Sequence, residues 1–295
     1  MRFLPPAPVL FASLLAAVTA PSSSAADTST YPPHTIANSE LRVLPRTADG
    51  RHYQLHIGLP ASYRENPERR YPVVYVTDAY WDFQKITSIH GSLVYDRVVP
   101  EFITVGLGYA GENLDYGNLR RWELSPVPFG GNEKDSGQAA KFLQTIASEI
   151  IPFVEREYRA DPSFRVLAGA SLGGLFTLNA LYTHPELFQG YVAATPAVLV
   201  AEDYLNQQEE AFARAGKPVS VRLYATAGGN EWPDFLSAIL RFNARIADRA
   251  YPGMAYDFRI IDGERHAGMQ LESYTRGLRF VFAPLAPESG PAVNR

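Results

Sequence analysis

Strand-like and helix-like segments alternate along most of this chain. The runs Pro72–Val76 and Phe102–Val105 are continuously apolar, as expected of strands that are buried on both faces. Residues 139–150 instead carry apolar side chains at three- and four-residue spacing, which predicts an amphipathic helix. Further strands are predicted at 165–168, 191–194, 221–225 and 256–260, and further helices at 175–182, 235–246 and 271–282. This alternation predicts an α/β fold, with a mostly parallel central sheet covered by helices on both faces.

An antiparallel edge is expected at the start of that sheet. Apolar side chains fall on every second position of residues 53–59, which is typical of a half-buried strand. The preceding run Leu41–Leu44 and the turn signal Asp49-Gly50 predict a hairpin. No repeat and no Ser/Gly linker divides the chain, so we expect one domain over residues 27–285 and a loose C-terminal tail over 286–295.

The first 26 residues have the pattern of a secretory signal peptide. Arg2 provides the positive start, Val9–Ala20 is the apolar region, and Ser24-Ala25-Ala26 offers small residues at a cleavage site. The apolar run is shorter than the roughly 20 residues that span a membrane. No cysteine follows it, which excludes a lipoprotein anchor. We therefore expect a periplasmic or secreted protein without a stable membrane anchor.

Composition excludes several classes of function. The 295 residues include 27 Lys and Arg against 31 Asp and Glu, for a net charge of -4, and no block of basic residues. This balance argues against nucleic acid as a partner. The absence of cysteine excludes disulfides, thiolate nucleophiles and Cys-ligated zinc.

A nucleophile motif lies between a predicted strand and a predicted helix. Gly169–Gly174 reads G-A-S-L-G-G, which matches G-x-S-x-G in the strand-turn-helix context that the motif requires. The small residues permit a sharp turn that lifts the Ser171 hydroxyl above the sheet. The turn also places Ser171 at a helix N-terminus, where free N–H groups favour a developing oxyanion. Ser171 is the predicted nucleophile.

A serine nucleophile needs a base, and histidine is the usual one near neutral pH. Only His266 follows the last predicted strand, which is where α/β-hydrolases place the base in the chain order Ser, acid, His. The other histidines lie near the N-terminus, on an early strand, after a predicted helix at residue 90, or at the end of the helix that follows the motif: His34, His52, His56, His90 and His184.

The acid of the triad is expected in the loop after the strand at 221–225. Glu231 and Asp234 both qualify, and Asp262 and Glu264 are weaker alternatives. Asp234 has a competing role as the N-cap of the next predicted helix. Glu231 has no such structural role, so it is the favoured acid, which would orient the imidazole.

Two other patterns are interpreted as structural. Gly106–Gly111 spells G-x-G-x-x-G after a strand, but no amphipathic helix follows to receive a dinucleotide, and we expect a flexible active-site loop there. His52 and His56 would lie about 13 Å apart on a strand, too far to share one metal ion. We expect neither a metal nor an organic cofactor.

The sequence resembles the esterase-D-like branch of the α/β-hydrolases, which includes feruloyl esterases, siderophore esterases of the enterobactin type and mycolyltransferases. The likeness extends over residues 35–282. It is carried by Tyr71–Asp78, Arg120–Pro126, Gly130-Gly131 before a predicted helix, Gly169–Gly174, Thr195-Pro196 and Gly263–His266. The siderophore esterases are the most similar, because their Arg-x-aromatic-acidic-x-Thr-Pro segment is close to the Arg-x-Trp-Glu-Leu-Ser-Pro at residues 120–126.

This resemblance implies further site residues. The N–H of Leu172 would form one half of an oxyanion hole and the N–H of Tyr80 the other, although Ala79 stands where the family often has glycine. Arg120 would contact a carbonyl or catecholate group of the substrate, and Trp81 would also bind substrate.

We therefore expect an exported serine ester hydrolase with an α/β-hydrolase fold that works through an acyl-enzyme. The expected partner is a small-molecule ester, in the first place an enterobactin-like siderophore. A feruloyl or carbohydrate-ester esterase, or an acyltransferase of the same fold, is the alternative. A non-catalytic binding protein is a third possibility, against which the intact Ser171 and His266 argue.

Overall fold

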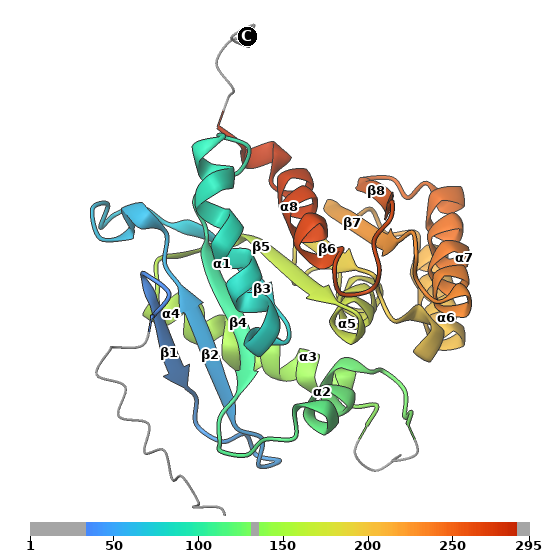
Figure 1. Cartoon of the computed structure of the whole chain (residues 1–295), viewed down its shortest axis with the longest axis horizontal. Coiled ribbons are helices and arrows are strands. Elements are labelled where there is room, and N and C mark those ends of the chain that lie inside the picture. Colours follow the sequence, from blue (N-terminus) through green and yellow to red (C-terminus); the bar gives the residue numbers. More distant parts are fainter. Residues whose placement is uncertain (1–33, 131–135, 288–295) are drawn as a thin grey trace, which may run out of the picture. The chain divides into compact units, whose positions relative to one another are not determined.

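One eight-stranded sheet organises the described residues, 34–130 and 136–287, in the computed structural model (Figure 1). The strand order is β1-β2-β4-β3-β5-β6-β7-β8. The pairs β1–β2 and β2–β4 are antiparallel and all others are parallel, which confirms the predicted antiparallel edge and parallel centre. The strands are β1 Ser39–Val43, β2 Tyr53–Gly58, β3 Tyr71–Val76, β4 Ile103–Tyr109, β5 Ala160–Ala170, β6 Gly190–Ala194, β7 Val221–Gly228 and β8 Met254–Ile261.

Helices cover both faces of this sheet. Buried residues of α1 and α8 form one apolar cluster with one face, and residues of α2, α3 and α4–α7 pack into a second cluster on the other face. The predicted helix at 139–150 becomes α3, a π-helical turn over Ile146–Ile150, and α4. The helices are α1 Ala79–Tyr95, α2 Tyr116–Leu124, α3 Ala139–Thr145, α4 Ile151–Glu157, α5 Leu172–Thr183, α6 Glu202–Ala215, α7 Pro233–Arg249 and α8 Gln270–Val281, with short 3₁₀ turns at Ala61–Tyr63, Val198–Val200 and Ala283–Leu285.

Strand β3 shows why a continuously apolar run marks the centre of such a sheet. All six of its residues are buried. Val74 and Val76 belong to the cluster under α1 and α8, whereas Val73 and Tyr75 belong to the opposite cluster. Because side chains alternate between the two faces of a strand, both faces need apolar residues when helices cover both.

Three sequence-based expectations were wrong. Gly106–Tyr109 is part of β4 and not a loop. A Cβ on Gly106 would lie 2.9 Å from the Cβ of Ala79, so this glycine lets α1 pack closely on the sheet. His90 lies inside α1 rather than after a helix. Asp234 does not cap α7, because the cap position is Trp232.

Two helices were not predicted, α2 and α6. The buried side of α6 is partly polar, because the fully buried Glu209 is paired with Arg245 and Arg249 of α7. Only Leu205 and Glu209 of α6 are fully buried, so its inward face offers few apolar residues from which to predict a helix.

The predicted signal peptide, residues 1–26, lies outside the described residues, as does most of the predicted tail at 286–295. From Ile36 onward the described residues cluster as one compact unit. None of the described helices is long and apolar enough to cross a membrane.

Helix α2 is held to the sheet by a buried carboxyl group. Glu123 is fully buried, and the hydroxyl of Tyr53 on β2 donates a hydrogen bond of 2.8 Å to its Oε1. Burial raises the pKa of Glu123 to about 8, and the bond from Tyr53 opposes part of that rise. This contact fixes the helix that also carries Arg120.

Replacing a helical glycine by alanine should change the free energy of unfolding in opposite directions at a closely packed position and at an open one. A Cβ on Gly277 of α8 would lie 2.5 Å from Cγ1 of the buried Val192, so Gly277→Ala should lower the free energy of unfolding by about 1–3 kcal/mol. A Cβ on Gly91 of α1 would meet nothing within 4 Å, so Gly91→Ala should raise it by about 0.5–1 kcal/mol. Urea unfolding of both variants measures these changes. Equal signs would contradict the packing described here.

The proton on Glu123 predicts a pH-dependent penalty. The folded chain keeps this proton up to about pH 8, whereas the unfolded chain releases it near the ordinary value of 4.5. Stability is therefore lost as pH rises through this window. Glu123→Gln still accepts from Tyr53 but does not ionise. We compare the free energy of unfolding in urea of the variant and the wild type at pH 5 and at pH 9. The variant's advantage over the wild type should be larger at pH 9 than at pH 5, by on the order of 2–4 kcal/mol. An equal difference at the two pH values would disprove this.

Candidate active site

Ser171 occupies a sharp turn between β5 and α5. Its backbone has φ 58° and ψ −116°, a conformation in which an L-residue is strained. Its N–H donates to the carbonyl of Ala194 at 3.0 Å, and its own carbonyl accepts from the N–H of Ala197 at 2.9 Å. Because Ala170 and Ala194 are paired in register at the ends of β5 and β6, the turn stands at the carboxyl edge of the sheet.

Glycine is required beside this turn. A Cβ on Gly169 would lie 2.5 Å from the backbone carbon and oxygen of Gly173. A Cβ on Gly174 would lie 3.0 Å from the carbonyl oxygen of Ala194. Backbone from β5, α5 and β6 therefore meets where only glycine leaves room, which is the physical basis of the motif.

His266 and Glu231 are in direct contact. His266 lies in the loop between β8 and α8, and its Nδ1 is 2.8 Å from Oε1 of Glu231 in the loop after β7. The side chain of Glu231 is fully buried and that of His266 is 23% exposed. Asp234, the alternative acid, is exposed in the first turn of α7. The geometry thus joins His266 to Glu231 and not to Asp234.

Backbone hydrogen bonds hold these two loops together. The N–H of Asn230 donates to the carbonyl of Glu264 at 2.9 Å, and the Asn230 side chain donates to the carbonyl of Gly263 at 2.9 Å. A Cβ on Gly228 would lie 2.6 Å from that Glu264 oxygen, so a glycine is needed for the loops to approach.

Two aromatic rings flank the imidazole. The ring centroid of Phe235 lies 5.0 Å from that of His266 in an edge-on arrangement, and that of Trp232 lies 5.5 Å away. These rings restrict the orientation of His266 and keep water from part of its surface.

Ser171 and His266 line the same cavity, which has a volume of about 290 Å³. Two ion pairs lie in its walls. Arg120 binds Asp78 through two bonds of 2.9 Å, and Lys85 binds Asp82 at 2.6 Å. The lining residues are Asp78, Trp81, Asp82, Lys85, Arg120, Ala170, Ser171, His266, Ala267 and Gln270.

Arg120 is held by the protein itself. Its Nε and Nη2 donate to the two oxygens of the buried Asp78. Burial alone would lower the pKa of Arg120, but the bonds and charge of Asp78 outweigh it and raise the pKa. The guanidinium is therefore a fixed cation in the cavity wall, with two of its donors already used. Sequence analysis did not foresee this partner.

The two residues predicted to bind an oxyanion, Tyr80 and Leu172, lie in the first turns of α1 and α5. The carbonyl of Asp78 accepts from the N–H groups of Trp81 and Asp82, which leaves the N–H of Tyr80 in the unpaired first turn of α1. Leu172 is likewise the first residue of α5.

Side chains of Tyr80 and Trp81 extend to the surface beside the cavity. Their exposed fractions are 65% and 45%. The ring of Tyr80 stacks on that of Tyr116 with centroids 5.0 Å apart, and the Arg120 guanidinium lies 5.8 Å from the centroid of Trp81. These residues, Tyr80, Trp81 and Tyr116, are called the aromatic shelf below.

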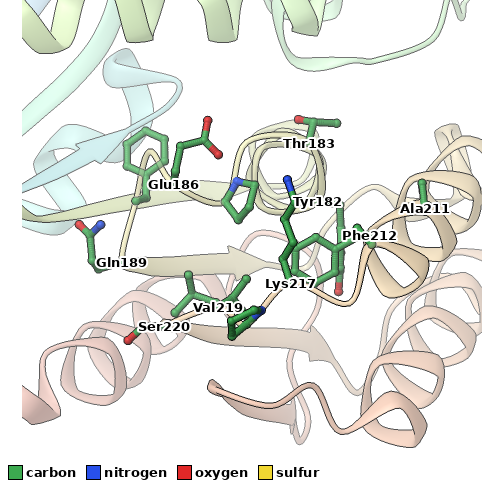
Figure 2. Close-up of a pocket in the computed structure, with 14 residues that line it drawn as sticks. Tyr182, Thr183, Glu186, Gln189, Ala211, Phe212, Lys217, Val219 and Ser220 are labelled. Atoms are coloured by element: carbon green, nitrogen blue, oxygen red, sulfur yellow. The ribbon is translucent and has the colours of Figure 1, made fainter.

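A larger cavity of about 660 Å³ lies elsewhere. Figure 2 shows its lining, which comes from the end of α5, the loop that leads from α5 to β6, the end of α6 and the segment that leads into β7. It includes the hydroxyls of Thr183 and Ser220 but no histidine to activate them. None of the predicted site residues lines it. The larger of these two cavities is therefore not the one that contains the predicted site residues.

Among residues 34–130 and 136–287, no group of three or more His, Asp or Glu side chains is arranged to hold a metal ion. Asp78, Lys85 and the rings of Trp232 and Phe235 were not predicted as site residues. Asp78 and the two rings meet the site through partners more than 30 residues away in the chain, Arg120 and His266, and the local pair of Lys85 with Asp82 does not distinguish a site from an ordinary helix surface.

Comparison with known proteins identifies relatives across most of the chain. A family model described as "Putative esterase" matches residues 47–239. The ferri-bacillibactin esterase BesA of Bacillus subtilis (strain 168) is 27% identical over 269 residues, which cover 86% of this chain and 92% of that protein. A siderophore enterobactin esterase of Emericella nidulans is 33% identical over 108 residues, or 32% of this chain and 36% of that protein.

Solved structures share the architecture. The BES protein from Bacillus cereus superposes with a TM-score of 0.77 at 25% identity, covering 85% of this chain and 97% of that chain. An IroE-like serine hydrolase from Shewanella oneidensis superposes with a TM-score of 0.75 at 23% identity, covering 85% and 82%. The predicted α/β-hydrolase fold is confirmed.

Proposed function

This chain belongs to the Esterase family and is a carboxylic ester hydrolase, and from that premise we propose that Ser171, His266 and Glu231 are its catalytic triad. The single observation that carries the proposal is the 2.8 Å contact between His266 and Glu231 beside the cavity that Ser171 also lines. We further propose that the protein is exported to the periplasm or secreted, on the pattern of residues 1–26.

In the proposed mechanism the Ser171 hydroxyl attacks the ester carbonyl while His266 takes its proton. The imidazolium that forms is stabilised by the buried carboxylate of Glu231. Negative charge develops on the carbonyl oxygen, and the N–H groups of Leu172 and Tyr80 are the proposed donors to it. His266 then protonates the leaving alcohol. Water, activated by the same histidine, hydrolyses the acyl-enzyme and releases the acid.

The proposed substrate is a siderophore ester of the enterobactin type. The relatives named above include esterases of ferri-bacillibactin and enterobactin. The aromatic shelf offers stacking surface for catechol rings, and Arg120, held in place by Asp78, offers its remaining N–H donors to a catecholate oxygen. A feruloyl ester is the second candidate, because the same shelf would stack a ferulate ring.

Loss of the nucleophile should abolish turnover without unfolding the protein. Ser171→Ala removes only the attacking oxygen, so kcat for p-nitrophenyl butyrate should fall on the order of 10³-fold or more, with an unchanged circular dichroism spectrum. Asn118→Ala, on the exposed surface of α2, is a control that should retain full activity. Substantial turnover by a folded Ser171→Ala variant would remove Ser171 from the mechanism.

Loss of a shelf ring should affect aromatic acyl groups selectively. Trp81→Leu keeps apolar bulk but removes the indole, so kcat/KM for enterobactin should fall about 10-fold, which corresponds to about 1.4 kcal/mol. Hydrolysis of methyl butyrate, which has no ring to stack, should change by less than about 2-fold. Tyr95→Leu is the matched control, because Tyr95 is an exposed ring at the far end of the same helix.

Two results would count against this substrate. Equal losses on enterobactin and methyl butyrate would mean that Trp81 supports the fold or the shared chemistry. Turnover of methyl ferulate without turnover of enterobactin or its ferric complex would favour the second candidate. Arg120→Ala is a poorer test, since it would leave the buried Asp78 without its cation and disturb every substrate alike.

A further inference from the structure

Thr195 holds a backbone conformation that β-branched residues rarely adopt. It directly follows β6 and has a φ of 39°, in the left-handed region. Its N–H donates to the carbonyl of Thr226 at 3.0 Å, and the residue is fully buried. Glycine would adopt this φ without strain. The presence of a threonine therefore needs an explanation in what its side chain contacts.

The contact is with the proposed triad acid. Oγ1 of Thr195 donates a hydrogen bond to Oε1 of Glu231, the same oxygen that lies 2.8 Å from Nδ1 of His266. The other oxygen, Oε2, is buried and has no hydrogen-bond partner among the residues that the structure describes. One carboxylate oxygen thus receives both donors.

We propose that Thr195 is a positioning residue for ester cleavage, which acts through Glu231 on His266. The proposal rests on the roles proposed above for these two residues. The imidazole takes the serine proton much faster when a correctly oriented carboxylate faces its Nδ1. A second donor on the same carboxylate oxygen fixes the rotation of the buried side chain, and so holds that oxygen toward the imidazole.

A purely structural role would have different consequences. If the Thr195 hydroxyl served only to satisfy a buried loop, its loss would lower stability and leave the rate per folded molecule unchanged. If it positions the carboxylate, its loss lowers kcat with little change in KM, because the interaction matters when charge develops on the imidazole.

The test compares three substitutions at this position. Thr195→Val keeps the shape and branching but removes the hydroxyl, and kcat for p-nitrophenyl acetate should fall about 10-fold with KM within about 2-fold. Thr195→Gly removes the hydroxyl and relieves the strain at φ 39°, so it should fold at least as well as the wild type and yet show the same loss. Thr195→Ser restores the donor and should recover kcat to within about 3-fold.

A substrate-free readout accompanies the kinetics. The Nδ1 proton of His266 gives an NMR resonance whose position reports the hydrogen bond to Glu231. This resonance should move in Thr195→Val and Thr195→Gly and return in Thr195→Ser. Thr226→Val is the matched control: its buried hydroxyl lies 2.9 Å from Oγ of Ser273 and not against the carboxylate, so neither kcat nor the resonance should change.

The outcomes separate this proposal from the proposed triad. Wild-type kcat and an unmoved resonance in folded Thr195→Val or Thr195→Gly would overturn the role of Thr195, even where Ser171→Ala is inactive and the triad stands. Equal impairment of Thr195→Val and Thr195→Ser would also overturn it, because the donor would then be irrelevant. If Ser171→Ala remained active, the triad would fail, and the resonance would still decide whether Thr195 orients Glu231.

Discussion

The close approach of three backbone segments at the end of β5 is the constraint on which the site depends. The turn at Ser171 is possible because glycines on either side lack the atoms that would collide. The Ser171 N–H is then fixed to the carbonyl of Ala194, the last residue of β6. The next residue, Thr195, reaches Glu231. A single strand end therefore contacts both the proposed nucleophile and the proposed acid, and it sets their separation.

The charged side chains in the cavity wall form ion pairs of opposite sign, so the wall does not carry charges of one sign only. Asp78 neutralises Arg120, and Asp82 neutralises Lys85. Burial raises the pKa of Asp82, whereas Lys85 and the hydroxyl of Tyr274 act in the opposite direction. Because each cation is tethered, a substrate meets donors whose directions are already set. Such preorganisation favours ligands by shape and hydrogen-bond geometry more than by net charge.

The parts of this molecule that sequence predicts are those governed by local pattern. Continuous apolar runs identified β3 and β4, and the spacing within Gly169–Gly174 identified the elbow, because strand burial and turn sterics act over a few residues. The other features depend on ion pairs between residues far apart in the sequence, which no local pattern indicates. The polar inner face of α6 is explained only by arginines on α7, and the partner of Arg120 is 42 residues away. Thr195 was noted only as part of the Thr195-Pro196 segment of the family resemblance, because its strain and its contact with Glu231 exist only in the folded chain.

The position of β8 in the strand order determines which part of the site unfolds first. β8 is an edge strand, paired in the described sheet with β7 alone, and it leads into the loop that carries His266. The turn at Ser171 follows β5, which lies between β3 and β6 well inside the sheet. Fraying of a sheet begins at its edges, where the fewest contacts must break. We therefore expect the loop that carries His266, the proposed base, to open more readily than the turn that carries Ser171, the proposed nucleophile. A partly opened molecule would keep Ser171 in place while His266 moves away from it.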